Sequence, residues 1–172
     1  MKSTTAKSIF AFRWRYVGLP LIFLLISVIL VAVFYNRLPF QVAYHFSSDG
    51  SPDMWAIPGL FVFWALLPQF LLTLGATAVT WVISLMATRY LDPESALVKP
   101  QRIMLIMGNM VAIPQLIIIF AMLDIFIYNS NYTHLRPSVL VFALIVMVLG
   151  GIILSAFFIQ TMRQVWMGKN KL

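Results

Sequence analysis

The chain alternates between long apolar runs and short polar segments. Four runs reach the roughly 18 apolar residues that mark a membrane-spanning helix, and about 20 helical residues cover a hydrocarbon core about 30 Å thick. They occupy residues 17–35, 59–87, 103–128 and 139–162. The pattern predicts an all-α integral membrane protein, in which residues 1–172 form a single membrane domain built as a bundle of four transmembrane helices.

Polar chemistry concentrates in residues 36–58, between the first and second runs. This segment holds one of the two histidines and two of the five acidic residues. Apolar and polar residues alternate from Phe40 to Ser47, which predicts an extended segment whose apolar face lies across the ends of the helices. Asp49-Gly50 is a turn signal. We therefore expect a structured outer loop.

The second half of this loop carries the signals of a short helical turn. Ser51, Pro52 and Asp53 fit an N-cap, a proline at the first helical position and an acid in the first turn. Trp55 would anchor that turn at the lipid headgroups before the second run begins.

Composition supports the membrane assignment and narrows the functional classes. The chain is 62% hydrophobic and 10% charged, whereas soluble domains carry about 25% charged residues. The net charge of +7 does not indicate nucleic-acid binding, because the basic residues flank the apolar runs and form no patch. Cysteine is absent, which excludes disulfides, thiolate catalysis and cysteine-ligated metals.

The basic residues predict the orientation in the cell membrane. Only Arg37 and Arg136 fall on one side of a four-helix zigzag, and the positive-inside rule makes that side external. Both termini are then cytoplasmic, and residues 36–58 and 129–137 face outward. The ten basic residues of the other side are Lys2, Lys7, Arg13, Arg15, Arg89, Lys99, Arg102, Arg163, Lys169 and Lys171.

Small and hydroxylated residues predict how the helices pack. A stripe at helical spacing marks one face of the second run and favours close helix packing, although a solute path would use similar residues. Gly108 and Ala112 form a small pair of the same kind in the third run. Pro68 and Pro114 lie inside spans and should bend them. The stripe comprises Gln69, Thr73, Thr77, Thr80 and Ser84.

The outer loop resembles the signature loop of a bacterial membrane family of unknown function. The domain of this family also forms the N-terminal part of the Sdp immunity protein (SdpI), which protects a producing cell from its own secreted peptide toxin. The resemblance implies a recognition or structural role for the loop motif. Its residues are Leu38, Pro39, His45, Phe46, Asp49, Gly50, Pro52, Asp53 and Trp55.

Several ionisable residues fall in or near the outer layer. Two imidazoles and a carboxylate could bind zinc, and the weak candidates are His45, Asp49 and His134, although no compact ligand motif such as H-E-x-x-H is present. Structural roles are the alternative: Asp49 shaping the turn, Asp53 starting a helix, and His45 holding the loop backbone.

Three polar residues lie within the third apolar run: Asp124, Asn109 and Gln115. An intramembrane carboxylate is by default a functional candidate. The alternative for Asp124 is that it reaches the interface or pairs with Arg37 or Arg136.

The chain contains no nucleophile–base arrangement, phosphate loop or cofactor motif. We therefore expect no enzymatic activity and no cofactor. The resemblance implies an immunity or signalling protein whose outer loop recognises an extracellular peptide. The alternatives are an accessory or scaffold subunit bound to another membrane protein and, less favoured, a metal- or proton-linked transporter or hydrolase. In each case the constant partner is the lipid bilayer.

Overall fold

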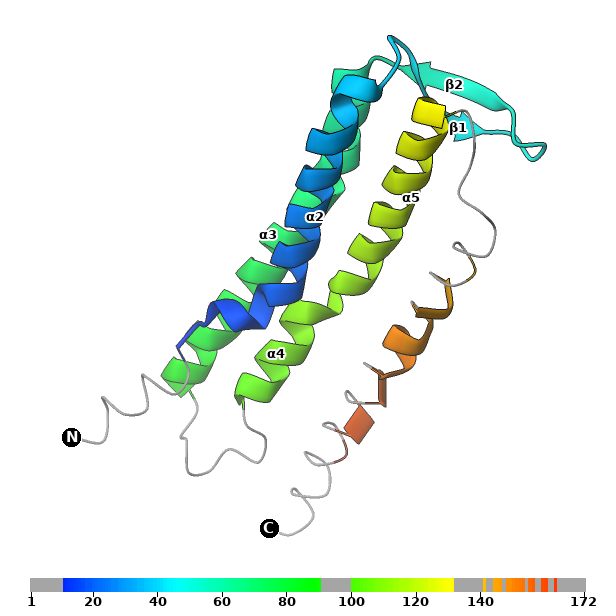
Figure 1. Ribbon diagram of the computed structural model, residues 1–172. Helices are drawn as coiled ribbons and strands as arrows, with labels where there is room; N and C mark the ends of the chain where they lie inside the picture. The colour runs from blue at the N-terminus through cyan, green and yellow to red at the C-terminus, as the bar shows by residue number, and fades with distance from the viewer. Residues whose placement is uncertain are drawn as a thin grey trace.

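Within residues 11–131, three helical columns stand side by side, and a small β-hairpin lies at one end of them (Figure 1). The computed structural model describes residues 11–90 and 100–131, together with scattered helical positions between 141 and 163. The elements in chain order are η1 (Trp14–Val17), α2 (Gly18–Phe34), η2 (Tyr35–Arg37), β1 (Val42–Phe46), β2 (Pro52–Ala56), α3 (Pro58–Tyr90), α4 (Pro100–Met110) and α5 (Ala112–Asn131).

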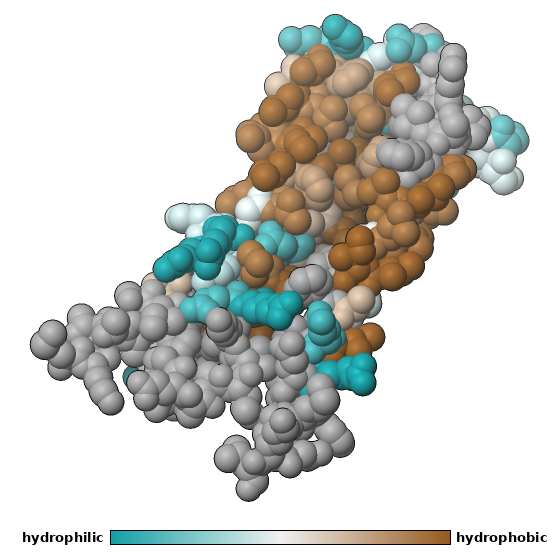
Figure 2. All heavy atoms as spheres, turned by 60° about the horizontal axis from the view of Figure 1, so that its bottom comes forward, coloured by the Kyte–Doolittle hydropathy of each residue, from teal (hydrophilic) through white to brown (hydrophobic). Residues whose placement is uncertain are grey.

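Long apolar helices occupy the first three expected spans. Helical stretches over residues 14–37, 58–89 and 101–131 are long and apolar enough to cross a bilayer. Figure 2 shows hydrophobic surface along the helices and hydrophilic residues toward both ends. The fourth expected span, residues 139–162, is described only in part, and a shorter apolar helical stretch occurs there at Leu144–Ile153.

The two prolines inside spans have different outcomes. The third helical column is interrupted at Val111, where α4 gives way to α5. Pro114 accounts for this break, because it has no N–H to donate and its ring crowds the carbonyl of Met110 one turn earlier. In contrast, α3 continues as a helix through Pro68.

The predicted packing face of α3 is buried. Gln69 and Thr80 are fully buried, and Thr73 and Ser84 nearly so. Thr77 is half-buried, and its hydroxyl donates to the Thr73 carbonyl at 2.8 Å. The hydroxyls of Thr73, Thr77 and Thr80 each donate to a backbone carbonyl of α3, so these residues can pack against neighbouring helices without an unpaired donor.

Gly108 lets α4 approach η1 and α3 closely. A Cβ at this position would lie 2.1 Å from the carbonyl oxygen of Tyr16 and 2.6 Å from Cγ2 of Thr80. No real side chain tolerates these separations. The role expected for Gly108 as a small-residue contact is therefore confirmed, and its expected companion Ala112 is buried.

A cluster of apolar residues lies directly beneath the hairpin. Val42 of β1 is buried with Phe61 of α3 and with Met122 and Phe126 of α5. The ring of Phe126 stacks on Phe34 of α2 at 5.4 Å and meets Phe61 edge-on at 5.7 Å between centroids. Aromatic pairs in such geometries are favourable beyond their buried area. The cluster thus joins the hairpin to all three helical columns.

We expect Gly108→Ala to destabilise the bundle by about 1–3 kcal/mol or more, because the added methyl group meets backbone atoms that cannot rotate away. Thermal unfolding in one mild detergent measures the effect. Gly75→Ala is the matched control, since a Cβ at Gly75 meets nothing within 4 Å. Equal unfolding temperatures for the two variants would contradict the close approach.

Candidate functional site

The loop between α2 and α3 folds into an antiparallel hairpin. Cα partners are Val42 with Ala56, Ala43 with Trp55, His45 with Met54, and Phe46 with Pro52. This register leaves Tyr44 as an extra residue on β1 and Asp53 as an extra residue on β2. Each is a β-bulge, a feature that bends the strand and re-aims nearby side chains.

The prediction of a helical turn starting at residues 51–53 is wrong. Pro52 instead begins β2, and Trp55 is a strand residue. The local signals of a helix start are equally compatible with this strand, because proline is tolerated at the first position of an edge strand. Pairing with β1 decides the outcome. The all-α description must therefore be extended by one two-stranded sheet.

The prediction that the first strand has one apolar face packed on the helices is also wrong in detail. Val42 and Ala43 are both buried, whereas Tyr44 is 41% exposed and Phe40, just before the strand, is 84% exposed. The bulge at Tyr44 shifts the alternation by one residue, so residues on either side of it no longer share a face. The hairpin consequently buries only part of its apolar surface against the helices.

The turn is built as its residues predict. Gly50 has φ of +82°, a conformation that glycine adopts without the steric cost of a Cβ. Its N–H donates to the Ser47 carbonyl at 2.9 Å. Asp49 accepts hydrogen bonds from the backbone N–H of Ser51 at 3.0 Å and from its hydroxyl at 2.7 Å. These two bonds lower the pKa of Asp49 and confirm its role in shaping the turn.

A polar pair links the two strands near the turn. Nδ1 of His45 lies 2.6 Å from Oδ1 of Asp53, and the Ser47 hydroxyl donates to Oδ2 of Asp53 at 3.2 Å. The expected roles of Asp53 at a helix start and of His45 on the loop backbone are therefore wrong. Both side chains remain well exposed, at 57% for His45 and 38% for Asp53, so the pair contributes modestly to stability.

The pair also sets a pH dependence for the hairpin. The hydrogen bond with His45 is the main cause of the lowered pKa of Asp53, and Ser47 adds to it while partial desolvation opposes it. Because the folded pKa is lowered, this stabilisation is present above the ordinary aspartate value of about 3.9. It is lost as the pH falls through the folded pKa.

Asn129 of α5 attaches the hairpin to the helices. Its Oδ1 accepts the backbone N–H of Ala43 at 2.8 Å, and its Nδ2 donates to the Ala43 carbonyl at 2.8 Å. Nδ2 also donates to the Ile125 carbonyl one turn earlier, at 2.8 Å. The side chain is buried. Sequence reasoning missed this residue, whose only signal is an amide directly after the third apolar run.

The remaining residues of the loop motif support this arrangement. Leu38 packs against the apolar cluster beneath the hairpin, and Pro39 beside it is half-buried. The ring of Phe46 meets Tyr128 of α5 edge-on at 4.7 Å. The motif therefore combines turn residues, strand residues and contacts to α5.

Two of the three polar residues of the third apolar run join helices. Oδ1 of Asn109 accepts the N–H of Leu19 at 2.9 Å in the first turn of α2, where backbone donors have no helical partner. Gln115 is fully buried, and its Nε2 donates to the Thr73 hydroxyl at 2.9 Å. Nε2 of Gln69 in turn donates to the backbone carbonyl of Gln115 at 2.9 Å. These residues stay apart from the hairpin and link α2, α3 and the third column.

The candidate metal ligands do not converge among the described residues. No group of three or more His, Asp or Glu side chains suited to a metal ion occurs within residues 11–90, 100–131 and the described positions beyond them. Asp49 is engaged with Ser51 and His45 with Asp53. His134 lies outside the described residues, and Asp124 is half-buried on α5.

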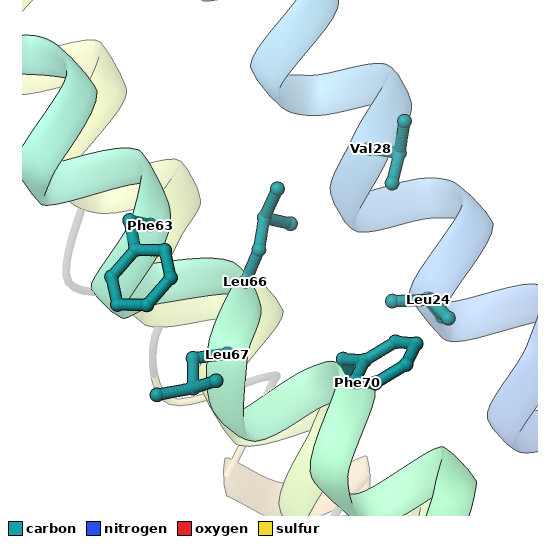
Figure 3. Close-up of a pocket in the computed structure, with 6 residues that line it drawn as sticks. All are labelled: Leu24, Val28, Phe63, Leu66, Leu67 and Phe70. Atoms are coloured by element: carbon teal, nitrogen blue, oxygen red, sulfur yellow. The ribbon is translucent and has the colours of Figure 1, made fainter.

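An apolar groove of about 410 Å³ lies between α2 and α3 (Figure 3). It contains no charged or hydrogen-bonding side chain and therefore offers no group for catalysis. Because its lining is apolar, the groove suits contact with acyl chains or with another apolar helix. The lining residues are Leu24, Val28, Phe63, Leu66, Leu67 and Phe70.

Residues 22–68 contain a domain of unknown function, DUF1648. The match covers most of α2, the whole hairpin and the start of α3 up to Pro68. No curated protein and no solved structure matches the chain. The class defined by the fold and this domain is thus a helical membrane-type protein with a hairpin between its first two long helices. The attachment residue Asn129 lies outside the matched segment.

We expect Asn129→Leu to release the hairpin from α5, because it leaves the buried N–H and C=O of Ala43 unpaired at a cost of about 1–3 kcal/mol. The chain has no cysteine, so a fluorophore on Ser48→Cys labels the hairpin alone, and its anisotropy should fall. Asn131→Leu is the control, since Asn131 is exposed at the end of α5. Unchanged anisotropy in Asn129→Leu would show that the hairpin is held by other contacts.

Proposed function

We propose that this is a non-enzymatic, multi-pass membrane protein that uses its hairpin to bind an extracellular peptide, as an immunity or signalling protein would. In this proposal the four apolar runs span the cell membrane, both termini are cytoplasmic, and the hairpin of residues 42–56 faces outward. The ten-to-two distribution of basic residues around the runs supports this orientation.

The paired hydrogen bonds between Asn129 and Ala43 carry the proposal. They hold a hairpin of otherwise modest stability in a fixed position on α5, because an isolated two-stranded sheet is marginal in water. A recognition element must be held in place if binding is to avoid the entropic cost of ordering it. The same contact couples any displacement of the hairpin to the end of α5.

The exposed side chains of the hairpin region also favour recognition. Aromatic residues and methionine are enriched at protein-binding surfaces, and methionine adapts its shape to different partners. The hydroxyl of Tyr44 contacts Sδ of Met54 at 3.6 Å, which places these two residues together. The exposed apolar residues are Phe40, Tyr44, Met54, Trp55 and Ile57.

An accessory or scaffold subunit is the second candidate. The apolar groove between α2 and α3 favours it, because another transmembrane helix would fit against such a surface. In that case the spans matter more than the hairpin. Stable co-purification with one membrane protein, abolished by Leu24→Trp and Leu67→Trp in the groove and unaffected by hairpin variants, would support this candidate over the first.

The orientation predicts a labelling pattern. Single cysteines at Ser48 and Ser130 should react with a membrane-impermeant maleimide added to intact cells, whereas cysteines at Ser3 and Ser95 should react only after permeabilisation. The positive-inside asymmetry is the physical reason. Labelling of Ser3 or Ser95 from outside would reverse the topology and remove the hairpin from the extracellular side.

Two hairpin variants test recognition in cells challenged with the secreted peptides of a producing culture. Gly50→Val forces a β-branched residue into positive φ, at a cost of about 1–2 kcal/mol or more, and His45→Ala removes the partner of Asp53. Both should reach the membrane at parental levels, because insertion depends on the apolar runs. Both should lose protection, Gly50→Val more completely.

Gly75→Val is the matched control, since it adds the same side chain where a Cβ meets nothing within 4 Å. It should protect cells as the parent does. Full protection by Gly50→Val and His45→Ala, at equal membrane levels, would show that the hairpin is not the recognition element. The scaffold candidate would then take its place.

A further inference from the structure

The two edges of the hairpin are not equivalent. On the β1 edge, the amide of Asn129 pairs with both backbone groups of Ala43, as a residue of a neighbouring strand would. That edge is therefore closed by α5. Figure 1 shows β1 against the end of α5 and β2 on its far side, so the edge of β2 is turned away from the helices.

The closed edge fixes the direction of the backbone groups on the open one. In an antiparallel pair, two opposed residues either exchange both hydrogen bonds or direct their N–H and C=O groups away from each other. Ala43 directs both groups to Asn129 and is opposed by Trp55. The N–H and C=O of Trp55 must therefore point away from β1, into the open edge of β2.

Outside the strand ladder, this pair of backbone groups has no hydrogen-bond partner among the residues that the structure describes. It is flanked by exposed side chains, because Met54 and Trp55 are each half exposed. Unpaired edges of this kind are templates for an added strand. Extended peptides bind such edges through main-chain hydrogen bonds, and side-chain contacts provide the specificity.

The length of the open edge indicates the kind of partner. The bulge at Asp53 and the proline at position 52 interrupt β2, so the regular edge runs only from Met54 to Ala56. Stable protein–protein interfaces bury about 1,200–2,000 Å², far more than edge-to-edge pairing of two such short strands provides. An extended peptide can instead continue over the neighbouring exposed apolar side chains.

We infer that an extended peptide segment binds as a third strand on the open edge of β2, with one of its residues forming paired hydrogen bonds to the N–H and C=O of Trp55. This inference rests on the proposed function, since it takes the hairpin as the recognition element, and it specifies how recognition occurs. Binding through the backbone makes the site tolerant of peptide sequence, with Tyr44, Met54 and the indole of Trp55 setting the preference.

The test uses the full chain in lipid nanodiscs and a probe peptide selected on it from a displayed library of short random sequences. Selection is counter-screened against empty nanodiscs of the same lipids. The probe is then synthesised in two N-methylated forms, one blocked at odd residues and one at even residues. Because the backbone N–H groups of a strand alternate between its two edges, only one form should bind about tenfold or more weakly.

Two protein variants separate backbone from side chain. Trp55→Pro removes the outward N–H, a change that an edge strand tolerates because proline there loses no ladder bond. Trp55→Val keeps the N–H and removes the same indole. We expect Trp55→Pro to bind the probe at least about tenfold more weakly than Trp55→Val. Anisotropy of the Ser48→Cys fluorophore equal to that of the parent in both variants verifies that the hairpin stays folded.

Equal effects of the two N-methylated forms, or equal binding by the two protein variants, would overturn the inference. A selection that yields no peptide preferring the protein, or peptides that bind empty nanodiscs equally, would also overturn it. So would probe-independent dimerisation that Trp55→Pro abolishes, because a second copy would then occupy the edge.

Cells that remain protected in the Trp55→Pro background would overturn this binding mode while leaving the proposed function intact. If the probe binds as a paired strand but the protein does not protect cells, the binding mode stands and the proposed function is overturned.

Discussion

The arrangement of the hairpin depends on one side chain in a helix that is distant in sequence. Asn129 uses both ends of its amide on the backbone of Ala43 and thereby replaces the missing neighbour of an edge strand. Without it, two buried backbone groups would lack partners, a loss that costs more than the bond itself contributes. The contact fixes which edge of the hairpin is closed and, through the antiparallel register, which groups the other edge presents.

The same use of amides recurs along the bundle. Asn109 pairs with the first turn of α2, and Gln115 joins α5 to Thr73 of α3. Such bonds matter in an apolar environment because hydrophobic burial drives helix association only weakly there. Close contacts at Gly108 and amide bonds together hold helices whose outward faces are almost wholly apolar. The amides of Asn109 and Gln115, which look like functional candidates in the sequence, thus join helices.

The hairpin differs from the helices in what it leaves exposed. Its bulges at Tyr44 and Asp53 divide the apolar residues, sending Val42 inward and leaving Tyr44 and Met54 at the surface. The His45–Asp53 pair closes the strands near the turn without burying either charge. A fixed attachment to α5, an exposed apolar surface and an open strand edge are the features that strand addition by a peptide would use.

The sequence by itself determined the long apolar helices, the buried polar face of α3 and the glycine turn at Gly50. Each depends on local periodicity or on the conformational limits of one residue. Only the tertiary structure decided that Pro52–Ala56 is a strand, that the alternation of β1 shifts at Tyr44, and that Asn129 is the attachment point. These features depend on pairing between segments distant in sequence. A helix-start signal and an edge strand look alike locally until a partner strand supplies the hydrogen bonds.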